Sequence, residues 1–288
     1  MPENFADRLL AAIDAKGSPV CVGLDPNLEK LPPELSGEPV RRVETFCLEV
    51  IDAVAATVPA VKPQIAYFER LGSAGVAVFE RVVAAARSAG LIVIADAKRG
   101  DIGSTAAQYA AAHLTGEFAA DALTVNSYFG LDGLAPFIET AGRTGRGVFA
   151  LVRTSNPSAG QIQDFADADG KTVFQHVAEC VAAAGAGRVG RSGYSAVGAV
   201  VGATYPAEAR RLRELMPRQV FLVPGYGAQG GTAADAVAGA DADGRGVIVN
   251  ASRSVIYAFA NAGRGDWRKA VAAAARAFAD DVRSALGG

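Results

Sequence analysis

The chain alternates from end to end between short apolar runs and longer alanine-rich segments. Apolar runs bounded by turn residues are typical of buried strands, and the segments between them carry apolar residues at helical spacing. The expected strands are 20–24, 60–65, 91–95, 122–125, 148–152, 196–201, 220–223 and 247–249. The expected helices lie near 40–57, 71–88, 104–115, 131–142, 172–185, 206–216, 232–239 and 267–285. This pattern predicts one α/β domain over 1–288, a (β/α)8 TIM barrel with its active site at the C-terminal ends of parallel strands.

The alternative fold is an open doubly wound sheet. It would carry a Gly-x-Gly-x-x-Gly fingerprint after the first strand. The first strand instead ends in Val-Gly-Leu-Asp-Pro at 22–26, which favours the barrel. Before it, apolar residues recur at helical spacing, so an amphipathic N-terminal helix is expected over 3–16.

Bulk composition argues against several classes of function. The net charge is -2 and no basic cluster stands out, which argues against nucleic-acid or anionic-membrane binding. Three cysteines without metal or disulfide spacing, and only two histidines, make a Cys/His metal site improbable and fit a reducing compartment. The N-terminus does not resemble a signal peptide, and no stretch is long and apolar enough to span a membrane. We therefore expect a cytoplasmic soluble protein.

One strand carries charge toward the interior. Residues 92–102 read Ile-Val-Ile-Ala-Asp-Ala-Lys-Arg-Gly-Asp-Ile, an apolar run that ends in acid, base and acid. Because strand side chains alternate between faces, Asp96 and Lys98 share the face of Ile92 and Ile94. Buried charge must be paired with another charge or with a ligand. An ordinary salt bridge at a strand end would give the same pattern, and this stretch alone leaves both interpretations open.

Polar residues follow most of the other predicted strands as well. Loops are polar in general, so the grouping carries the argument rather than any single residue. Residues 155–171 form the longest segment without expected structure, and a long loop at this end of a barrel is often a lid. Composition alone favours a plain surface loop, so both interpretations stay open. Residues 186–195 are expected to be an exposed connection. The polar strand ends are Asp25, Lys62, Gln64, Asp96, Lys98, Asp101, Asn126, Arg153, Thr154, Ser155, Asn156 and residues 224–231 and 250–253.

The loops after the last two strands predict a phosphate site. TIM barrels often bind phosphate there. Glycines in 224–231 let backbone N–H groups approach an anion, and Gln229 adds an amide donor. Thr232 could cap the next helix, and Arg253 offers a forked guanidinium after the last strand. A phosphorylated small molecule is therefore the expected ligand.

These motifs together resemble the orotidine 5'-phosphate decarboxylase family, in particular its longer bacterial, mycobacterial-like subgroup. The matching motifs follow the family's order along nearly the whole barrel. They are Val-Gly-Leu-Asp at 22–25, Val-Lys-Pro at 61–63, Asp-x-Lys-x-x-Asp-Ile at 96–102, Pro-Gly-Tyr-Gly-Ala-Gln-Gly-Gly at 224–231 and Ser-Arg-Ser at 252–254.

The resemblance implies decarboxylation of orotidine 5'-monophosphate (OMP) to UMP, the last step of de novo pyrimidine synthesis, without metal or organic cofactor. It implies a homodimer with active sites shared between subunits. Lys62, Asp96, Lys98 and Asp101 would form a charged catalytic tetrad.

The resemblance also implies substrate contacts. Ser252 stands where many members have glycine, and Asn126 and Tyr226 are weaker candidates. By resemblance, Asp25 would bind the ribose hydroxyls, and Ser155, on the lid, would contact the pyrimidine. Gln229 and Arg253 would bind the phosphate, with Ser252 beside them. Ile102 and Thr105, together with Asp101, would contribute to the active site of the neighbouring subunit.

Three other classes of function would use parts of the same pattern. A sugar-phosphate decarboxylase or hexulose-phosphate synthase of the same superfamily would use magnesium. By resemblance, such an enzyme would carry an acidic residue where this chain has Lys62. The positive charge of Lys62 disfavours binding of a metal ion at that position. A Schiff-base aldolase would want a desolvated lysine rather than one flanked by acids. A nucleotide-binding protein without activity is the non-enzyme alternative, and the intact acid-base-acid set argues against it.

Overall fold

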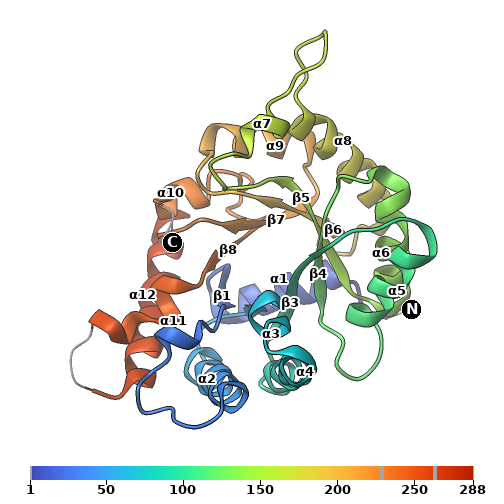
Figure 1. Ribbon diagram of the computed structural model, residues 1–288. Coiled ribbons are helices and arrows are strands. Elements are labelled where there is room, and N and C mark those ends of the chain that lie inside the picture. The colour runs from blue at the N-terminus through green and yellow to red at the C-terminus, as the bar shows by residue number, and fades with distance from the viewer. Residues whose placement is uncertain (1, 228–229, 262–264, 288) are drawn as a thin grey trace.

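The computed structural model describes residues 2–227, 230–261 and 265–287, and within them eight parallel strands close into a barrel (Figure 1). Each strand pairs with its neighbours in chain order, and β1 closes the ring against β8. The predicted barrel is confirmed. The strands are β1 Val20–Leu24, β2 Ala60–Pro63, β3 Ile92–Arg99, β4 Ala122–Val125, β5 Gly147–Arg153, β6 Ser195–Val201, β7 Gln219–Pro224 and β8 Val247–Ala251.

Helices surround the barrel, and their apolar faces cover the outer faces of the strands in one continuous core (Figure 1). No helix within the described residues is long and apolar enough to cross a membrane. The helices are α1 Phe5–Lys16, α2 Pro39–Val54, α3 Ala66–Glu69, α4 Gly72–Ser88, α5 Gly103–Leu114, α6 Gly130–Thr144, α7 Gly160–Gln163, α8 Val173–Gly185, α9 Pro206–Leu215, α10 Ala233–Ala236, α11 Arg253–Ile256 and α12 Trp267–Ala285, with 3-10 turns η1 Leu28–Lys30, η2 Ala186–Arg188 and η3 Ala258–Asn261.

The inward face of the barrel forms a second core, to which α1 contributes. Asn4 caps this helix by accepting a hydrogen bond from the N–H of Ala6, and Gly17 ends it in the left-handed region. Phe5 of this helix packs edge-to-face on Phe149, and a Cβ on Gly147 would collide with the ring of Phe5. The predicted N-terminal helix is therefore present, and it packs against the inward-facing side chains of the strands.

Two predicted segments, the loop 155–171 and the helix 232–239, differ from the structure. Residues 155–171 are not structureless, since they contain α7 and a bridge between Ala166 and Thr172, and they project from the barrel (Figure 1). Residues 186–195 connect α8 to β6 and are mostly exposed or half-buried, as expected, and they contain η2 and a bridge between Val189 and Ser195. The helix expected at 232–239 has only the four residues of α10. Asp7, on α1, holds the 186–195 segment by accepting hydrogen bonds from the N–H groups of Arg191 and Ser192, a contact that local pattern could not predict.

Candidate active site

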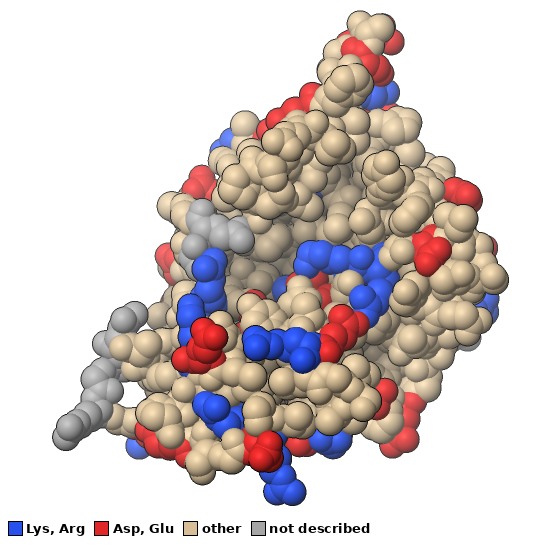
Figure 2. All heavy atoms as spheres, viewed as in Figure 1, with Lys and Arg blue, Asp and Glu red and all other residues tan. Residues whose placement is uncertain are grey.

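A cavity of about 500 Å³ opens at the C-terminal ends of the strands, and all eight strands or the loops after them line it. In Figure 2 Lys and Arg side chains border this hollow on the drawn face. Seven predicted site residues line it. They are Asp25, Lys62, Asp96, Lys98, Ser155, Ser252 and Arg253.

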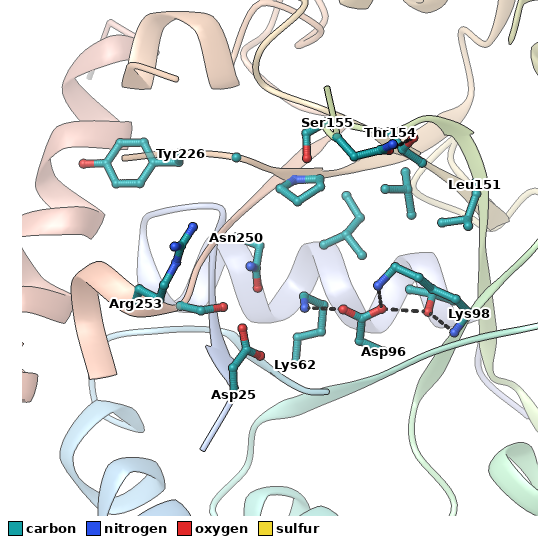
Figure 3. Close-up of a pocket in the computed structure, with 17 residues that line it drawn as sticks. Asp25, Lys62, Asp96, Lys98, Leu151, Thr154, Ser155, Tyr226, Asn250 and Arg253 are labelled. Atoms are coloured by element: carbon teal, nitrogen blue, oxygen red, sulfur yellow. Dashed lines mark hydrogen bonds and ion pairs between the residues drawn. The ribbon is translucent and has the colours of Figure 1, made fainter. Parts of the chain in front are cut away.

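Asp96 lies between two lysines on one wall of the cavity. The Nζ of Lys62 donates to Oδ2 of Asp96 at 2.7 Å, and the Nζ of Lys98 donates to Oδ1 at 2.6 Å (Figure 3). Lys62 and Asp96 are buried, whereas the Lys98 side chain is 47% exposed toward the cavity. The arrangement holds two cations on one carboxylate and leaves the Lys98 ammonium open to a ligand.

Electrostatics keep the buried pair charged. Burial alone would raise the pKa of Asp96, but the ammonium groups of Lys62 and Lys98 outweigh it, and this pKa lies far below its ordinary value. Burial would lower the pKa of Lys62, yet the carboxylates of Asp96 and Asp25 raise it above its ordinary value. Both side chains are therefore ionised at neutral pH.

The backbone of β3 is irregular where it presents Lys98. Lys98 has φ 46°, the single non-glycine residue with positive φ in the described part of the chain, and the β3–β4 register shifts between Ala95 and Arg99. Thr124 Oγ1 accepts hydrogen bonds from the N–H groups of Ala97 (3.1 Å) and Lys98 (2.9 Å) and donates to Asp96 Oδ1 (3.0 Å). Such backbone costs about 1–3 kcal/mol and tends to occur at functional sites.

Sequence reasoning missed Thr124 as part of the site. Strand alternation could have indicated this residue, because Thr124 stands two residues after the inward-facing Ala122 and so places a polar side chain inside the barrel. Asn250 on β8 was grouped with the polar strand ends but was given no contact of its own, although it lines the cavity.

The opposite end of the cavity has the features of the predicted phosphate site. Gly225, with φ 109°, lines it together with Ser252 and Arg253. A Cβ on Gly23 would lie 1.9 Å from Ser252 Oγ, so this glycine makes room for the serine. Thr232 caps α10 as predicted, but this helix has only four residues, so its dipole is weak. Gln229 lies outside the described residues.

Three predicted residues lie outside the cavity of the single chain. Asp101 Oδ1 accepts from the N–H of Ile102 at 2.8 Å, and Asp101, Ile102 and Thr105 do not line the cavity. The Ile102 side chain is 58% exposed. Asp101 therefore does not flank Lys98 within one chain.

Two weaker candidates have structural contacts. Asn126 Oδ1 accepts from the N–H of Tyr128 and so stabilises a turn. Tyr226 lines the cavity edge, but its hydroxyl donates to Asp281 and points away in Figure 3.

Arg153, at the end of β5, lies under the 155–171 segment rather than in the cavity. It is buried and pairs with Glu208 on α9 (2.6 Å) and with Asp164 (2.6 Å). Its guanidinium lies 4.1 Å from the ring centre of Tyr205. Next to it, the amide of Gln163 bonds Thr154, which lines the cavity, through both its oxygen and its nitrogen.

Comparisons with known proteins agree with this geometry. A family model described as "Orotidine 5'-phosphate decarboxylase / HUMPS family" matches residues 18–263. Relatives named orotidine 5'-phosphate decarboxylase include one from Rhodopirellula baltica, 48% identical over 94% of this chain and 96% of that protein, and one from Deinococcus radiodurans, 41% identical over the full length of both. A solved structure from Streptomyces avermitilis is 40% identical with a TM-score of 0.86, covering 100% of this chain and 98% of that one. The OMP decarboxylase of Leishmania donovani is 32% identical with a TM-score of 0.80, covering 99% of both.

Proposed function

Because the chain belongs to the orotidine 5'-phosphate decarboxylase / HUMPS family, we propose that Lys98 supplies the charge and the proton on which its reaction depends. That reaction is the decarboxylation of OMP to UMP, a step of pyrimidine biosynthesis. The observation that carries the proposal is the Lys98 ammonium, held by Asp96 at 2.6 Å and open to the cavity.

The chemistry requires a cation beside one carbon. Loss of carbon dioxide leaves an electron pair in an in-plane orbital at C6, which the pyrimidine ring cannot delocalise. An ammonium fixed beside C6 stabilises this carbanion as it forms, because its charge is already oriented. Lys98 then gives a proton to C6, which completes UMP.

The neighbouring charges keep Lys98 in place. Asp96 accepts its hydrogen bond, and Lys62 balances the charge of Asp96 from the buried side. Repulsion between Asp96 and the substrate carboxylate would add ground-state destabilisation, which we rank below stabilisation of the carbanion. Enzymes lower barriers by roughly 8–23 kcal/mol. One lysine cannot provide this alone, so binding of the phosphate and ribose must contribute.

Arg253 and Lys98 stand on opposite sides of the cavity, which gives the substrate its direction (Figure 3). The phosphate would lie at Arg253, Ser252 and the glycine-rich loop, where N–H groups and a guanidinium suit an anion. C6 would then lie at Lys98, with Ser155 near the pyrimidine and Asp25 near the ribose.

A second copy of the chain would complete the site. Asp101, Ile102 and Thr105 lie beside exposed apolar side chains of the β4–α6 connection, among them Tyr128 (82% exposed) and Phe129. A Cβ on Gly100 would contact Phe129 at 3.4 Å, so the two segments are adjacent. Exposed apolar patches mark association surfaces. A homodimer would bury this patch and bring Asp101 to the Lys98 of its partner.

The proposed function predicts turnover without a divalent cation. Lys62 pairs with one carboxylate oxygen of Asp96 at 2.7 Å and Lys98 with the other at 2.6 Å, and two adjacent cations disfavour a metal ion there. OMP should therefore lose its ultraviolet absorbance signature at the same rate with and without EDTA. A strict requirement for magnesium would favour the sugar-phosphate alternative, and binding of OMP without product would favour the non-enzyme alternative.

The 155–171 segment is proposed as a lid, and its anchor gives a further prediction. Asp164→Asn removes the ion pair that holds the segment to Arg153, while Glu208 still neutralises the buried guanidinium. Hydrogen bonds to charged groups contribute about 1.5–3 kcal/mol, reduced here because Asp164 is half exposed. We expect kcat/KM for OMP to fall about 3- to 10-fold.

The matched control is Asp167→Asn on the same segment, whose carboxylate bonds only local N–H groups among the described residues. It should leave kcat/KM unchanged. Equal losses in both variants would show that the Arg153–Asp164 pair does not position the lid.

A further inference from the structure

Two oxygens in the described part of the cavity have no hydrogen-bond partner. They are Oδ1 of Asn250 and Oδ1 of Asp25, and both atoms are buried. The whole Asn250 side chain is buried, with 7% of the residue exposed. Buried polar atoms are almost always paired in native proteins, and an unpaired one costs about 1–3 kcal/mol. Such atoms in a binding cavity indicate that a ligand supplies the donors.

The fold brings these two residues together. Asn250 is the next-to-last residue of β8 and Asp25 directly follows β1, and these strands pair with Cys21 opposite Asn250. Gly23 on β1 lies beside Asn250, and a Cβ there would be 3.4 Å from the Asn250 amide nitrogen. The missing Cβ leaves the amide accessible from the cavity.

Their place in the cavity limits which part of a ligand they can meet. In Figure 3 Asn250, Asp25 and Lys62 lie between Arg253 on one side and Asp96 and Lys98 on the other. If the phosphate lies at Arg253 and C6 at Lys98, as proposed above, the sugar of a nucleotide lies between them. The phosphate and the carboxylate are ionised and donate nothing, and the pyrimidine N3–H lies across the ring from C6. The ribose hydroxyls are the donors that remain.

We propose that Asn250 determines sugar specificity, accepting a hydrogen bond from one ribose hydroxyl while Asp25 takes the other. This inference rests on the proposed function, because it needs the phosphate and the reacting carbon at the two ends of the cavity. Two unpaired acceptors match the two donors of a vicinal diol. A deoxyribonucleotide would leave one buried oxygen unpaired, and sites built to bind a hydroxyl reject analogues that lack it.

The test is calorimetric binding of UMP, 2'-deoxy-UMP and 3'-deoxy-UMP, which needs no turnover. Asn250→Leu keeps the size of the side chain and removes the acceptor. We expect this variant to weaken the binding of UMP about 5- to 30-fold. The affinity for one of the two deoxy analogues, the one that lacks the hydroxyl bound by Asn250, should be unchanged. Asn250→Ala, which adds no apolar branch, should give the same pattern if the leucine variant does not fold.

Gln219→Met is the matched control. Gln219 is also a buried amide with an unpaired oxygen, but it begins β7 and does not line the cavity. The Gln219→Met variant should bind all three nucleotides with the affinity of the wild type. Equal weakening of all three by Asn250→Leu, or no weakening of UMP, would overturn the role of Asn250. Failure of the wild type to bind UMP at all would instead reject the proposed function.

Discussion

Replacing Lys98 by alanine should reduce turnover of OMP by at least about 10⁴-fold. The variant loses a preoriented charge, worth about 10²–10³-fold. It also loses the group that protonates C6, worth about 10²–10⁴-fold. The two losses belong to one side chain and should act together. The measurement is the decrease in ultraviolet absorbance as OMP is consumed.

The Lys98→Ala variant should remain folded. Asp96 keeps its 2.7 Å contact with Lys62, so no buried carboxylate is left unpaired, and the Lys98 side chain is half exposed. Its melting temperature should stay within a few degrees of the wild type. The control is Lys171→Ala, which removes an exposed lysine of the 155–171 segment that pairs with Glu179 of α8. This variant should keep full activity. A Lys98→Ala rate within tenfold of the wild type would reject the proposed role.

Asp101→Ala should cost about 10²–10³-fold in kcat, although Asp101 lies outside the cavity of its own chain. The expected loss comes from the partner's site, where this carboxylate would hold the Lys98 ammonium from the side opposite Asp96. In the single chain Asp101 Oδ1 accepts only the adjacent N–H of Ile102 among the described residues. Folding should therefore be little affected. Near wild-type turnover by a dimeric Asp101→Ala protein would contradict the shared site.

The periodic part of the molecule could be predicted from the sequence. The strand at 122–125 agrees at both ends with β4, and the helix at 267–285 with α12. Apolar runs in parallel strands and helical spacing in the segments between them are local signals. Period-two alternation also placed Asp96 on the inward face, and the polar strand ends already included Lys62 and Arg253.

The rest depends on contacts that are distant in sequence or on departures from regular geometry. Simple alternation ignores the irregularity that Thr124 stabilises in β3, so it could not give the left-handed backbone of Lys98. Arg153 was grouped with the polar strand ends, but Glu208, 55 residues later, pairs with it outside the cavity. Asn250 is a polar residue near the end of a strand, but its unpaired oxygen becomes apparent only once β8 lies beside β1.

In the proposed dimer, each reacting lysine lies between Asp96 of its own chain and Asp101 of a second copy. The most direct test is to mix inactive Lys98→Ala and Asp101→Ala proteins under conditions where subunits exchange. Half of the dimers would then be mixed, each with one intact site, so activity should recover to about a quarter of the wild-type value if subunits pair at random. Continued inactivity of a mixture in which mixed dimers are shown to form would contradict the claim.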